Sequence, residues 1–169
     1  MNLDQTIRQF IDRFQIPDLK PVDWKGSADR LRQQFYLASR AIEKDAPEMA
    51  DISPLMVGGG AGRLKARLYT PLGAGVAPGA GIIFFHGGGF VLGDLDSHDM
   101  LCRRLAEGAR SRVLSVDYRL APEHRFPAAH EDAVAVWNWV QAHAAEVGLN
   151  PERLAVSGDS AGGNLSAFL

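Results

Sequence analysis

The sequence predicts an α/β fold, with a mostly parallel sheet flanked by helices. Short apolar runs that are typical of buried strands occur at residues 82–85, 113–116 and 154–156. Helical patterns separate them, over residues 96–110 and 128–146. Strands that alternate with helices in this way indicate βαβ units, in which neighbouring strands run parallel.

Two helices are expected before the sheet. Apolar residues recur at helical spacing over residues 3–14, until Pro17 and Pro21 break the pattern. A second helix is expected after Ser27, a suitable N-cap, and should end before Pro47. Neither helix carries a chemical motif, so we expect a lid or packing role for both.

The first two strands of the sheet are predicted to form a hairpin. Residues 52–57 and 64–69 have strand patterns, and the glycine-rich stretch 58–62 between them suits a turn. Residues 71–81 are rich in glycine, proline and alanine, which indicates a surface loop.

The composition and charge limit which classes of protein this chain can belong to. The chain has 169 residues, of which 46% are hydrophobic and 22% charged, as in an ordinary globular domain. A formal net charge of −2 gives no electrostatic reason to expect a nucleic-acid partner. No apolar run approaches about 18 residues, so no membrane span is predicted. The N-terminus shows no signal-peptide pattern, so a cytoplasmic location is expected. The single cysteine, Cys102, lies in a helical pattern and is expected to be a buried thiol.

A serine motif follows the last predicted strand. Residues 158–162 read Gly-Asp-Ser-Ala-Gly, the G-x-S-x-G pattern of a nucleophile elbow, whose sharp strand-to-helix turn exposes the Ser160 hydroxyl. Gly158 and Gly162 are small enough for such a turn. The helix beginning at Ala161 directs N–H groups to the same spot, so the Ala161 N–H is a candidate oxyanion donor. Alone, this motif is a weak signal, because a glycine-rich turn that binds nothing matches it as well.

A glycine run supplies a second element. His86-Gly87-Gly88-Gly89 directly follows the predicted strand 82–85, where a hydrolase places its other oxyanion donors. Successive glycines let backbone N–H groups approach a substrate carbonyl without interference from side chains. Taken alone, the run also suits a tight turn or a phosphate cradle, although a cradle usually has G-x-G-x-x-G or a following lysine. The two elements together favour acyl transfer.

Four separated blocks of the sequence resemble one known family. They are His86-Gly87-Gly88-Gly89-Phe90, residues 117–124 (Asp-Tyr-Arg-Leu-Ala-Pro-Glu-His), residues 126–129 (Phe-Pro-Ala-Ala) and residues 158–163 (Gly-Asp-Ser-Ala-Gly-Gly). In this order they resemble the hormone-sensitive-lipase-like carboxylesterases of the α/β-hydrolase fold, the bacterial family IV. The resemblance runs from about residue 50 onward and covers only the N-terminal portion of a typical member.

The resemblance implies a role for each motif residue. Ser160 would be the nucleophile that forms an acyl-enzyme. Gly88 and Gly89 would donate backbone N–H groups to the oxyanion hole, with Ala161 as the third donor. His86 would hold the glycine loop by hydrogen bonding and would not be the base. Members of the family act on short to medium acyl esters, and the resemblance implies that no cofactor is needed.

The resemblance also implies the domain organisation. Residues 1–47 would be a helical cap segment, and residues 48–169 the N-terminal part of the catalytic domain. In this fold the acid and the base histidine follow the serine, so both are expected beyond Leu169, in a C-terminal half that would be the partner of this chain. Without that half, the strand before Ser160 would be an exposed sheet edge, which makes a homo-oligomer a further expectation. The alternative is a non-catalytic ligand-binding protein on the same scaffold.

The remaining polar residues give weaker signals. Five histidines precede the serine: His86, His98, His124, His130 and His143. The order of the triad in this fold argues against each of them as the base. Asp94, Asp96 and Asp99 surround His98, but their spacing matches no standard metal site, and helix capping explains them better. No metal is predicted, and Asp159 is expected to point away from the nucleophile.

Overall fold

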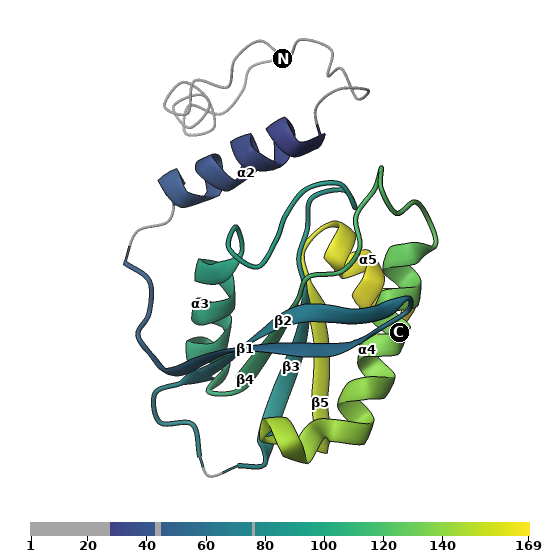
Figure 1. Cartoon of the computed structure of the whole chain (residues 1–169). Coiled ribbons are helices and arrows are strands. Elements are labelled where there is room, and N and C mark those ends of the chain that lie inside the picture. Colours follow the sequence, from purple (N-terminus) through teal and green to yellow (C-terminus); the bar gives the residue numbers. More distant parts are fainter. Residues whose placement is uncertain (1–27, 43–44, 76) are drawn as a thin grey trace, which may run out of the picture.

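The computed structural model describes residues 28–42, 45–75 and 77–169 of the chain. Its elements, in chain order, are α2 (Ala28–Ile42), β1 (Met49–Gly59), β2 (Gly62–Pro71), β3 (Gly79–Phe85), α3 (Asp99–Ala109), β4 (Arg112–Val116), α4 (Ala128–His143), the 3-10 helix η1 (Ala144–Val147), β5 (Leu149–Gly158) and α5 (Ala161–Phe168) (Figure 1). The helix expected over residues 3–14 and the Ser27 cap lie outside the described residues. Every other predicted strand and helix is present.

The sheet is mixed, and its parallel half carries the motifs. The strand order is β1-β2-β4-β3-β5. The pairs β1–β2 and β2–β4 are antiparallel, whereas β4–β3 and β3–β5 are parallel. Phe85, the last residue of β3, lies opposite Val116 on β4 and Gly158 on β5. The three parallel strands therefore end level, and the loops that follow them meet at one edge, where open α/β sheets bind their ligands.

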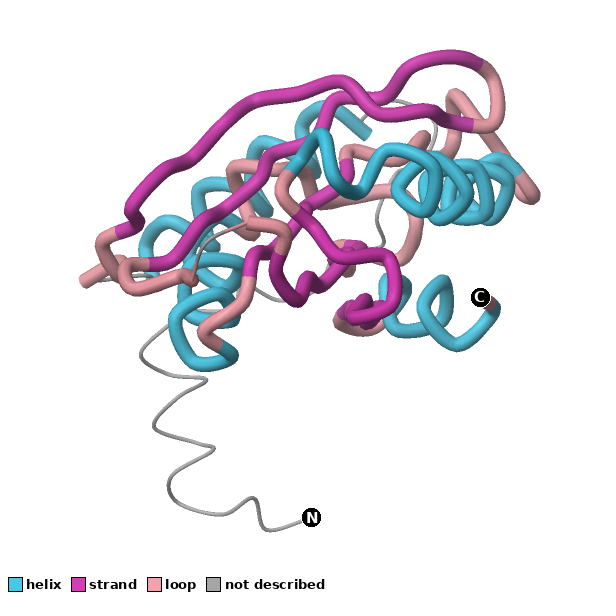
Figure 2. The backbone as a smooth tube through the Cα atoms, turned by 90° about the horizontal axis from the view of Figure 1, so that it is seen from below, coloured by secondary structure: helices cyan, strands magenta, loops and turns pink. Residues whose placement is uncertain are grey.

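Helices cover both faces of this sheet (Figure 2). Side chains alternate along each strand, so Ile83 and Phe85 pack toward α4 and α5, whereas Phe84 packs toward α3. Cys102 of α3 is fully buried in the second layer, as expected, and burial raises the pKa of its thiol to about 12. Within the described residues, every helix is too short or too polar to cross a lipid bilayer.

Helix α3 begins three residues later than the predicted start at Asp96. The Asp94 carboxylate accepts hydrogen bonds from the N–H groups of Asp96 and Ser97, at 3.1 and 2.6 Å, and these bonds close a turn before the helix. The expected capping of the helix by these acids is therefore wrong in detail. The N-cap residue is His98, whose side chain makes no capping bond.

Candidate active site

Ser160 lies on a strained turn between β5 and α5. Its backbone angles are φ +51° and ψ −113°, a region that non-glycine residues rarely occupy, and its side chain is exposed. A Cβ atom on Gly162 would lie 1.8 Å from the Phe85 carbonyl oxygen, and one on Gly158 would lie 2.4 Å from the Gly162 backbone. Both positions therefore require glycine, as the elbow motif predicts.

The glycine loop after β3 is closed on one side and open on the other. Gly88 and Gly89 have φ angles of +115° and +63°. The Gly88 carbonyl accepts hydrogen bonds from Val91 and Leu92, and a Cβ on Gly88 would lie 2.2 Å from the Leu92 oxygen. A Cβ on Gly89 would meet nothing within 4 Å, and Gly89 is exposed. A substrate can therefore approach the loop at Gly89.

The loop and the elbow lie against each other. The Gly87 N–H donates a hydrogen bond of 2.8 Å to Oδ1 of Asp159, the residue before the serine. Asp159 thus faces the glycine loop. The N–H groups of Gly88, Gly89 and Ala161 find no hydrogen-bond acceptor among the described residues. The structure thus brings the glycine loop into contact with the turn that carries the exposed Ser160.

His86 has the surroundings of a structural residue. It is completely buried, and its Nδ1 lies 2.8 Å from the Gly87 carbonyl oxygen, so this nitrogen carries the proton. The Tyr118 hydroxyl donates to the His86 carbonyl at 2.6 Å, and the two rings stack with centroids 4.4 Å apart. Burial lowers the pKa of the His86 imidazole to about 4, so the ring stays neutral. These contacts fit the loop-holding role that the resemblance implies.

The other histidines have partners away from the serine. His130 lies within hydrogen-bond distance of Asn164, and the His143 ring stacks on Trp139 and lies 2.8 Å from the carbonyl oxygen of that residue. His124 is exposed. No histidine in the described part of the chain hydrogen-bonds to the candidate nucleophile. These contacts therefore identify none of the three histidines as a base for Ser160.

His98 has a partner that the sequence did not indicate. Its Nε2 lies 3.5 Å from Oδ1 of Asp159, and its side chain is only 8% exposed. The contact with His98 is the largest cause that lowers the pKa of the Asp159 carboxyl below its usual range. No motif signals this contact, because the residue pairs two elements that are distant in the sequence.

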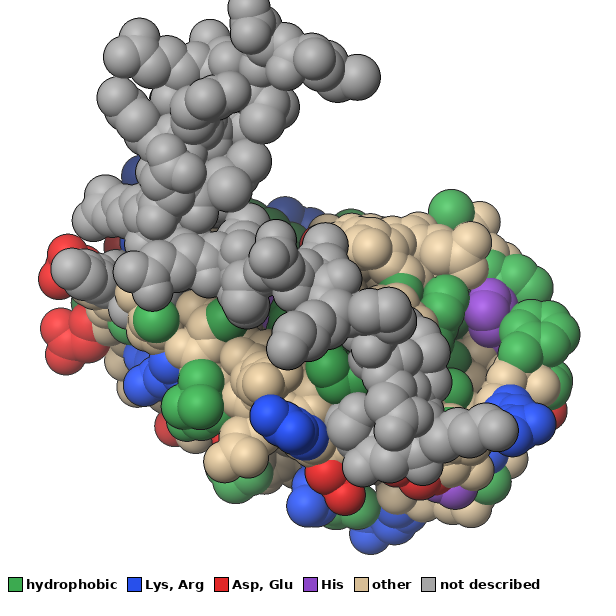
Figure 3. Space-filling model, turned by 90° about the horizontal axis from the view of Figure 1, so that it is seen from above, with side chains coloured by type: hydrophobic (Ala, Val, Ile, Leu, Met, Phe, Trp, Pro, Cys, Tyr) green, Lys and Arg blue, Asp and Glu red, His purple; other side chains and the backbone are tan. Residues whose placement is uncertain are grey.

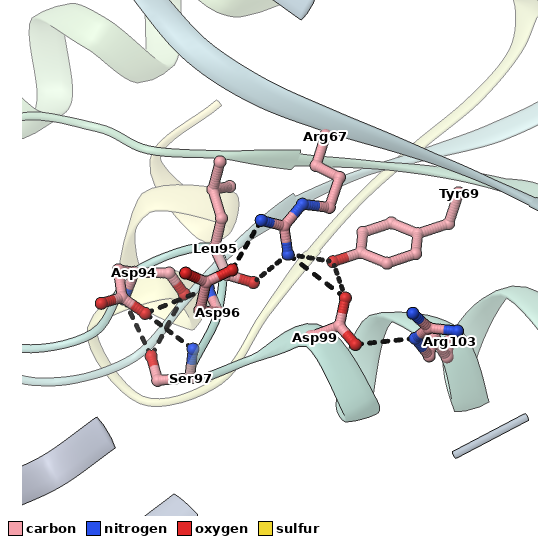
Figure 4. A network of polar contacts seen from close by, with 8 residues as sticks. All are labelled: Arg67, Tyr69, Asp94, Leu95, Asp96, Ser97, Asp99 and Arg103. Atoms are coloured by element: carbon pink, nitrogen blue, oxygen red, sulfur yellow. Dashed lines mark hydrogen bonds and ion pairs between the residues drawn. The ribbon is translucent and has the colours of Figure 1, made fainter. Parts of the chain in front are cut away.

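Two of the acids near His98, Asp96 and Asp99, are bound by arginines. Arg67 of β2 contacts Asp96 at 2.6 Å and Asp99 at 3.2 Å, and Arg103 contacts Asp99 at 2.7 Å (Figure 4). Among the residues that the structure describes, no group of three histidine, cysteine or acidic side chains could hold a metal ion. These acids thus anchor the segment before α3.

Arg32 ties α2 to the loops of this edge. Its guanidinium forms two hydrogen bonds with Glu123, of 2.8 and 2.7 Å. It also donates to the carbonyl oxygens of Val91 and Ala121, at 2.9 and 3.0 Å. The hydrogen bonds from Arg32 lower the pKa of Glu123 to about 2. Helix α2 is therefore attached beside the glycine loop.

An apolar pocket of about 260 Å³ adjoins the glycine loop. It is lined by Gly89, Phe90, Ala121, His124, Phe126, Ala129 and His130. Phe126 is 82% exposed at its rim. The view onto this end of the molecule shows hydrophobic side chains around a histidine at one edge (Figure 3). The pocket can take a small uncharged group next to the unoccupied donors.

Comparisons with known proteins place the chain among proteins of known fold and activity. A family model for the alpha/beta hydrolase fold matches residues 82–169. The chain is 55% identical over 120 residues to the carboxylic ester hydrolase LipN of Mycobacterium tuberculosis, covering 70% of this chain and 31% of that protein. It is 45% identical over 144 residues to an ethyl acetate hydrolase of Pseudomonas putida, covering 84% of this chain and 45% of the relative.

A solved structure gives the same result. The esterase from Pyrobaculum calidifontis superposes with a TM-score of 0.84 at 38% identity, over 98% of this chain and 51% of that one. The chain spans about half or less of the length of these relatives.

Proposed function

This chain belongs to the hormone-sensitive-lipase-like family of the α/β-hydrolase fold, and from that premise we propose that the full-length protein hydrolyses carboxylic esters through Ser160. The observation that carries the proposal is an exposed and strained serine next to the glycine loop, with three N–H groups, on Gly88, Gly89 and Ala161, that find no acceptor among the described residues. Preorganised donors of this kind stabilise the oxyanion of acyl transfer.

In the proposed reaction, the serine turn supplies the nucleophile and the glycine loop supplies two of the oxyanion donors. The Ser160 hydroxyl oxygen attacks the ester carbonyl carbon, and its proton passes to a histidine that we propose follows Ser160 in the full-length protein, with the acid that orients it. The carbonyl oxygen becomes an oxyanion, held by the N–H groups of Gly88, Gly89 and Ala161. The bond to the alcohol oxygen breaks, the alcohol takes the proton from the histidine, and water then hydrolyses the acyl-enzyme.

The pocket supports small uncharged substrates. Its apolar lining and its volume of about 260 Å³ suit a short to medium acyl group next to Gly89. The name of the Pseudomonas putida relative, ethyl acetate hydrolase, points to an ester of the same size class. Residues 1–47 would be a cap segment over this pocket, a role that the attachment of α2 through Arg32 supports.

The nucleophile is tested by a single substitution. In the full-length protein, Ser160→Ala should abolish hydrolysis of p-nitrophenyl acetate and butyrate, because no other hydroxyl lies at the elbow. Ser166→Ala is the matched control. Its hydroxyl donates to the Gly162 carbonyl one turn along the same helix, and hydrolysis should continue in this variant. Near-normal turnover by Ser160→Ala would remove this serine from the mechanism.

Covalent labelling separates the enzyme from the alternative. A fluorophosphonate should label the full-length protein at Ser160, because an activated hydroxyl attacks phosphorus. A ligand-binding protein on this scaffold would bind an ester without hydrolysing it and would remain unlabelled.

A further inference from the structure

We infer that His98 is a positioning residue for the proposed ester hydrolysis. Through Asp159, it fixes the Gly87 peptide and with it the loop that carries the Gly88 and Gly89 donors. The inference rests on the proposed function for its catalytic consequence, whereas the structural link can be measured without activity.

The first link joins Asp159 to the glycine loop. Oδ1 of Asp159 accepts the Gly87 N–H at 2.8 Å. A Cβ on Gly87 would lie 2.0 Å from the other carboxylate oxygen, so the carboxylate approaches this closely only because the residue is glycine. The Gly87 N–H is therefore directed toward Asp159, and the next two N–H groups have no acceptor within the part of the chain that the structure describes. The orientation of the Gly87 peptide therefore determines where the backbone continues into Gly88 and Gly89.

The second link joins His98 to Asp159. The His98 Nε2 lies 3.5 Å from the same Oδ1. On the other side of the ring, Nδ1 lies 3.1 Å from the Ser97 hydroxyl, whose single proton can go to this nitrogen or to the Asp94 carbonyl oxygen, which is also 3.1 Å away. A bare Nε2 would face the lone pairs of a carboxylate, so Asp159 favours the form with a proton on Nε2. That nitrogen lies on the side of the ring that faces the oxygen bonded to Gly87.

Packing fixes the His98 ring in this place. Its neighbours are the rings of Phe35, Phe84 and His86, with centroids 5.9, 6.3 and 5.3 Å away. Because the side chain is only 8% exposed, the imidazole has little freedom to turn away from Asp159. The contact is therefore held by an enclosed side chain.

The backbone that carries His98 is anchored to the sheet. Arg67 on β2 donates to the Leu95 carbonyl at 3.1 Å and contacts Asp96 and Asp99 (Figure 4). These bonds hold both sides of His98. A continuous set of contacts thus runs from β2 through His98 and Asp159 to the glycine loop.

The structural link is tested by hydrogen exchange of the Gly87 amide, measured by NMR on the full-length protein. His98→Leu removes the donor to Asp159, and the Gly87 amide should exchange faster by on the order of 10-fold, because a hydrogen bond to a charged acceptor is weakened. His98→Gln offers a side-chain N–H in place of Nε2–H and should restore much of the protection. His143→Leu is the matched control, since it also removes one histidine contact and one stacked ring, far from the loop.

The catalytic consequence is tested by steady-state kinetics of the same variants in the full-length protein. His98→Leu should lower kcat by roughly 10- to 100-fold with little change in KM, because a displaced donor acts on the transition state. His98→Gln should recover most of kcat, and His143→Leu should behave as the wild type. Asp159→Asn keeps an oxygen for Gly87 without the charge, and should fall between the wild type and His98→Leu.

The outcomes separate the two ideas. If Ser160→Ala stays active, the proposed function fails, whatever the exchange data show. If hydrolysis depends on Ser160 but His98→Leu keeps both kcat and Gly87 protection, only the positioning role is wrong. A rise in KM at unchanged kcat also contradicts it. If His98→Leu does not fold, His98→Gln and Asp159→Asn decide: wild-type exchange and kcat in both would overturn the inference.

Discussion

Two glycine turns in this molecule are each held by an aspartate, and the aspartates differ in their surroundings. In the hairpin between β1 and β2, the Gly60 N–H donates to Asp132 Oδ1 at 2.8 Å. In the loop after β3, the Gly87 N–H donates to Asp159 Oδ1 at the same distance. Both bonds join segments 72 residues apart, so each closes a long-range contact.

The two carboxylates have different further partners. Asp132 is fully buried and also accepts from the Arg119 backbone N–H and guanidinium, at 2.9 to 3.0 Å. Asp159 is 45% exposed, and its further side-chain partner is His98. The enclosed aspartate is part of the core, whereas the open one lies next to Ser160. The same type of hydrogen bond, from a glycine N–H to an aspartate, thus stabilises the core at Gly60 and the candidate site at Gly87.

The largest expected effect is on the enclosed turn. Asp132→Ala leaves the Arg119 guanidinium without its buried partner, and should lower the free energy of unfolding by about 3–5 kcal/mol. Urea denaturation measures it. Glu131→Ala, which removes the exposed partner of the same arginine, is the control and should cost at most about 1 kcal/mol. If Asp159→Ala destabilised the protein as much as Asp132→Ala, the contrast between the two turns would not hold.

The buried imidazole beside the open turn predicts a pH-dependent stability. Burial lowers the pKa of His86 from 6.5 to about 4, so below pH 6.5 the unfolded chain takes up a proton that the folded protein excludes. The free energy of unfolding should therefore fall as the pH drops from 6.5 to 4, by at most about 3 kcal/mol, and the contribution is fully present above pH 6.5. Urea denaturation at several pH values measures this slope. His98, Asp94 and Asp159 interact electrostatically with His86 and remain in the His86→Asn variant, so an equal slope in that variant would contradict the assignment.

A methyl group added to each turn should act differently. On Gly60 it would meet the Glu131 Cβ at 2.8 Å and the Arg119 guanidinium at 2.9 Å, and Gly60→Ala should cost about 1–3 kcal/mol through overpacking. On Gly87 it would meet the Asp159 carboxylate, which can turn into solvent, and the Asp159 carbonyl oxygen at 3.0 Å. Gly87→Ala should therefore cost less stability and more kcat than Gly60→Ala. Thermal unfolding and ester turnover of both variants compare the two, and the reverse ranking would break the comparison.

The smallest effect concerns the charge of the open carboxylate. Contact with His98 lowers the pKa of Asp159 below its ordinary 3.8, so its contribution to stability is present above that pH. It should fade as the pH falls through the lowered pKa, because the protonated carboxyl no longer attracts His98. Above pH 3.8 the wild type should be slightly more stable than Asp159→Asn, and acid titration of both should show this small difference disappear at the acid end. A difference between them that persisted in full down to pH 1 would point to another cause.

Most of the fold was open to prediction from local patterns. The apolar run at 82–85 and the alternation at 64–69 each specify a strand without reference to the rest of the chain. The boundary of α3 was misplaced because the Asp94 carboxylate closes a turn where the pattern already suits a helix. The sheet is less parallel than expected, because the hairpin joins it through antiparallel pairs.

In the candidate site, too, local motifs were predicted from the sequence, whereas long-range contacts were not. Ser160 and the glycine loop were found because each turn has a short motif, and the structure places the two turns against each other. The contact of His98 with Asp159 was missed because it depends on how α3 packs against the sheet, and the acids beside His98 suggested capping or a metal instead. Long-range contacts of single polar residues leave no periodic signal.

The close contact of Gly162 with the end of β3 has a further consequence. Its bare backbone sits directly on the Phe85 carbonyl, with no side-chain atom between α5 and the end of β3. The serine turn and the glycine loop are thus both built on that shared end of β3. When the sheet bends, the serine turn and the glycine loop should move together with the end of β3. The distance between the nucleophile and the donors should therefore change little when other parts of the molecule bend.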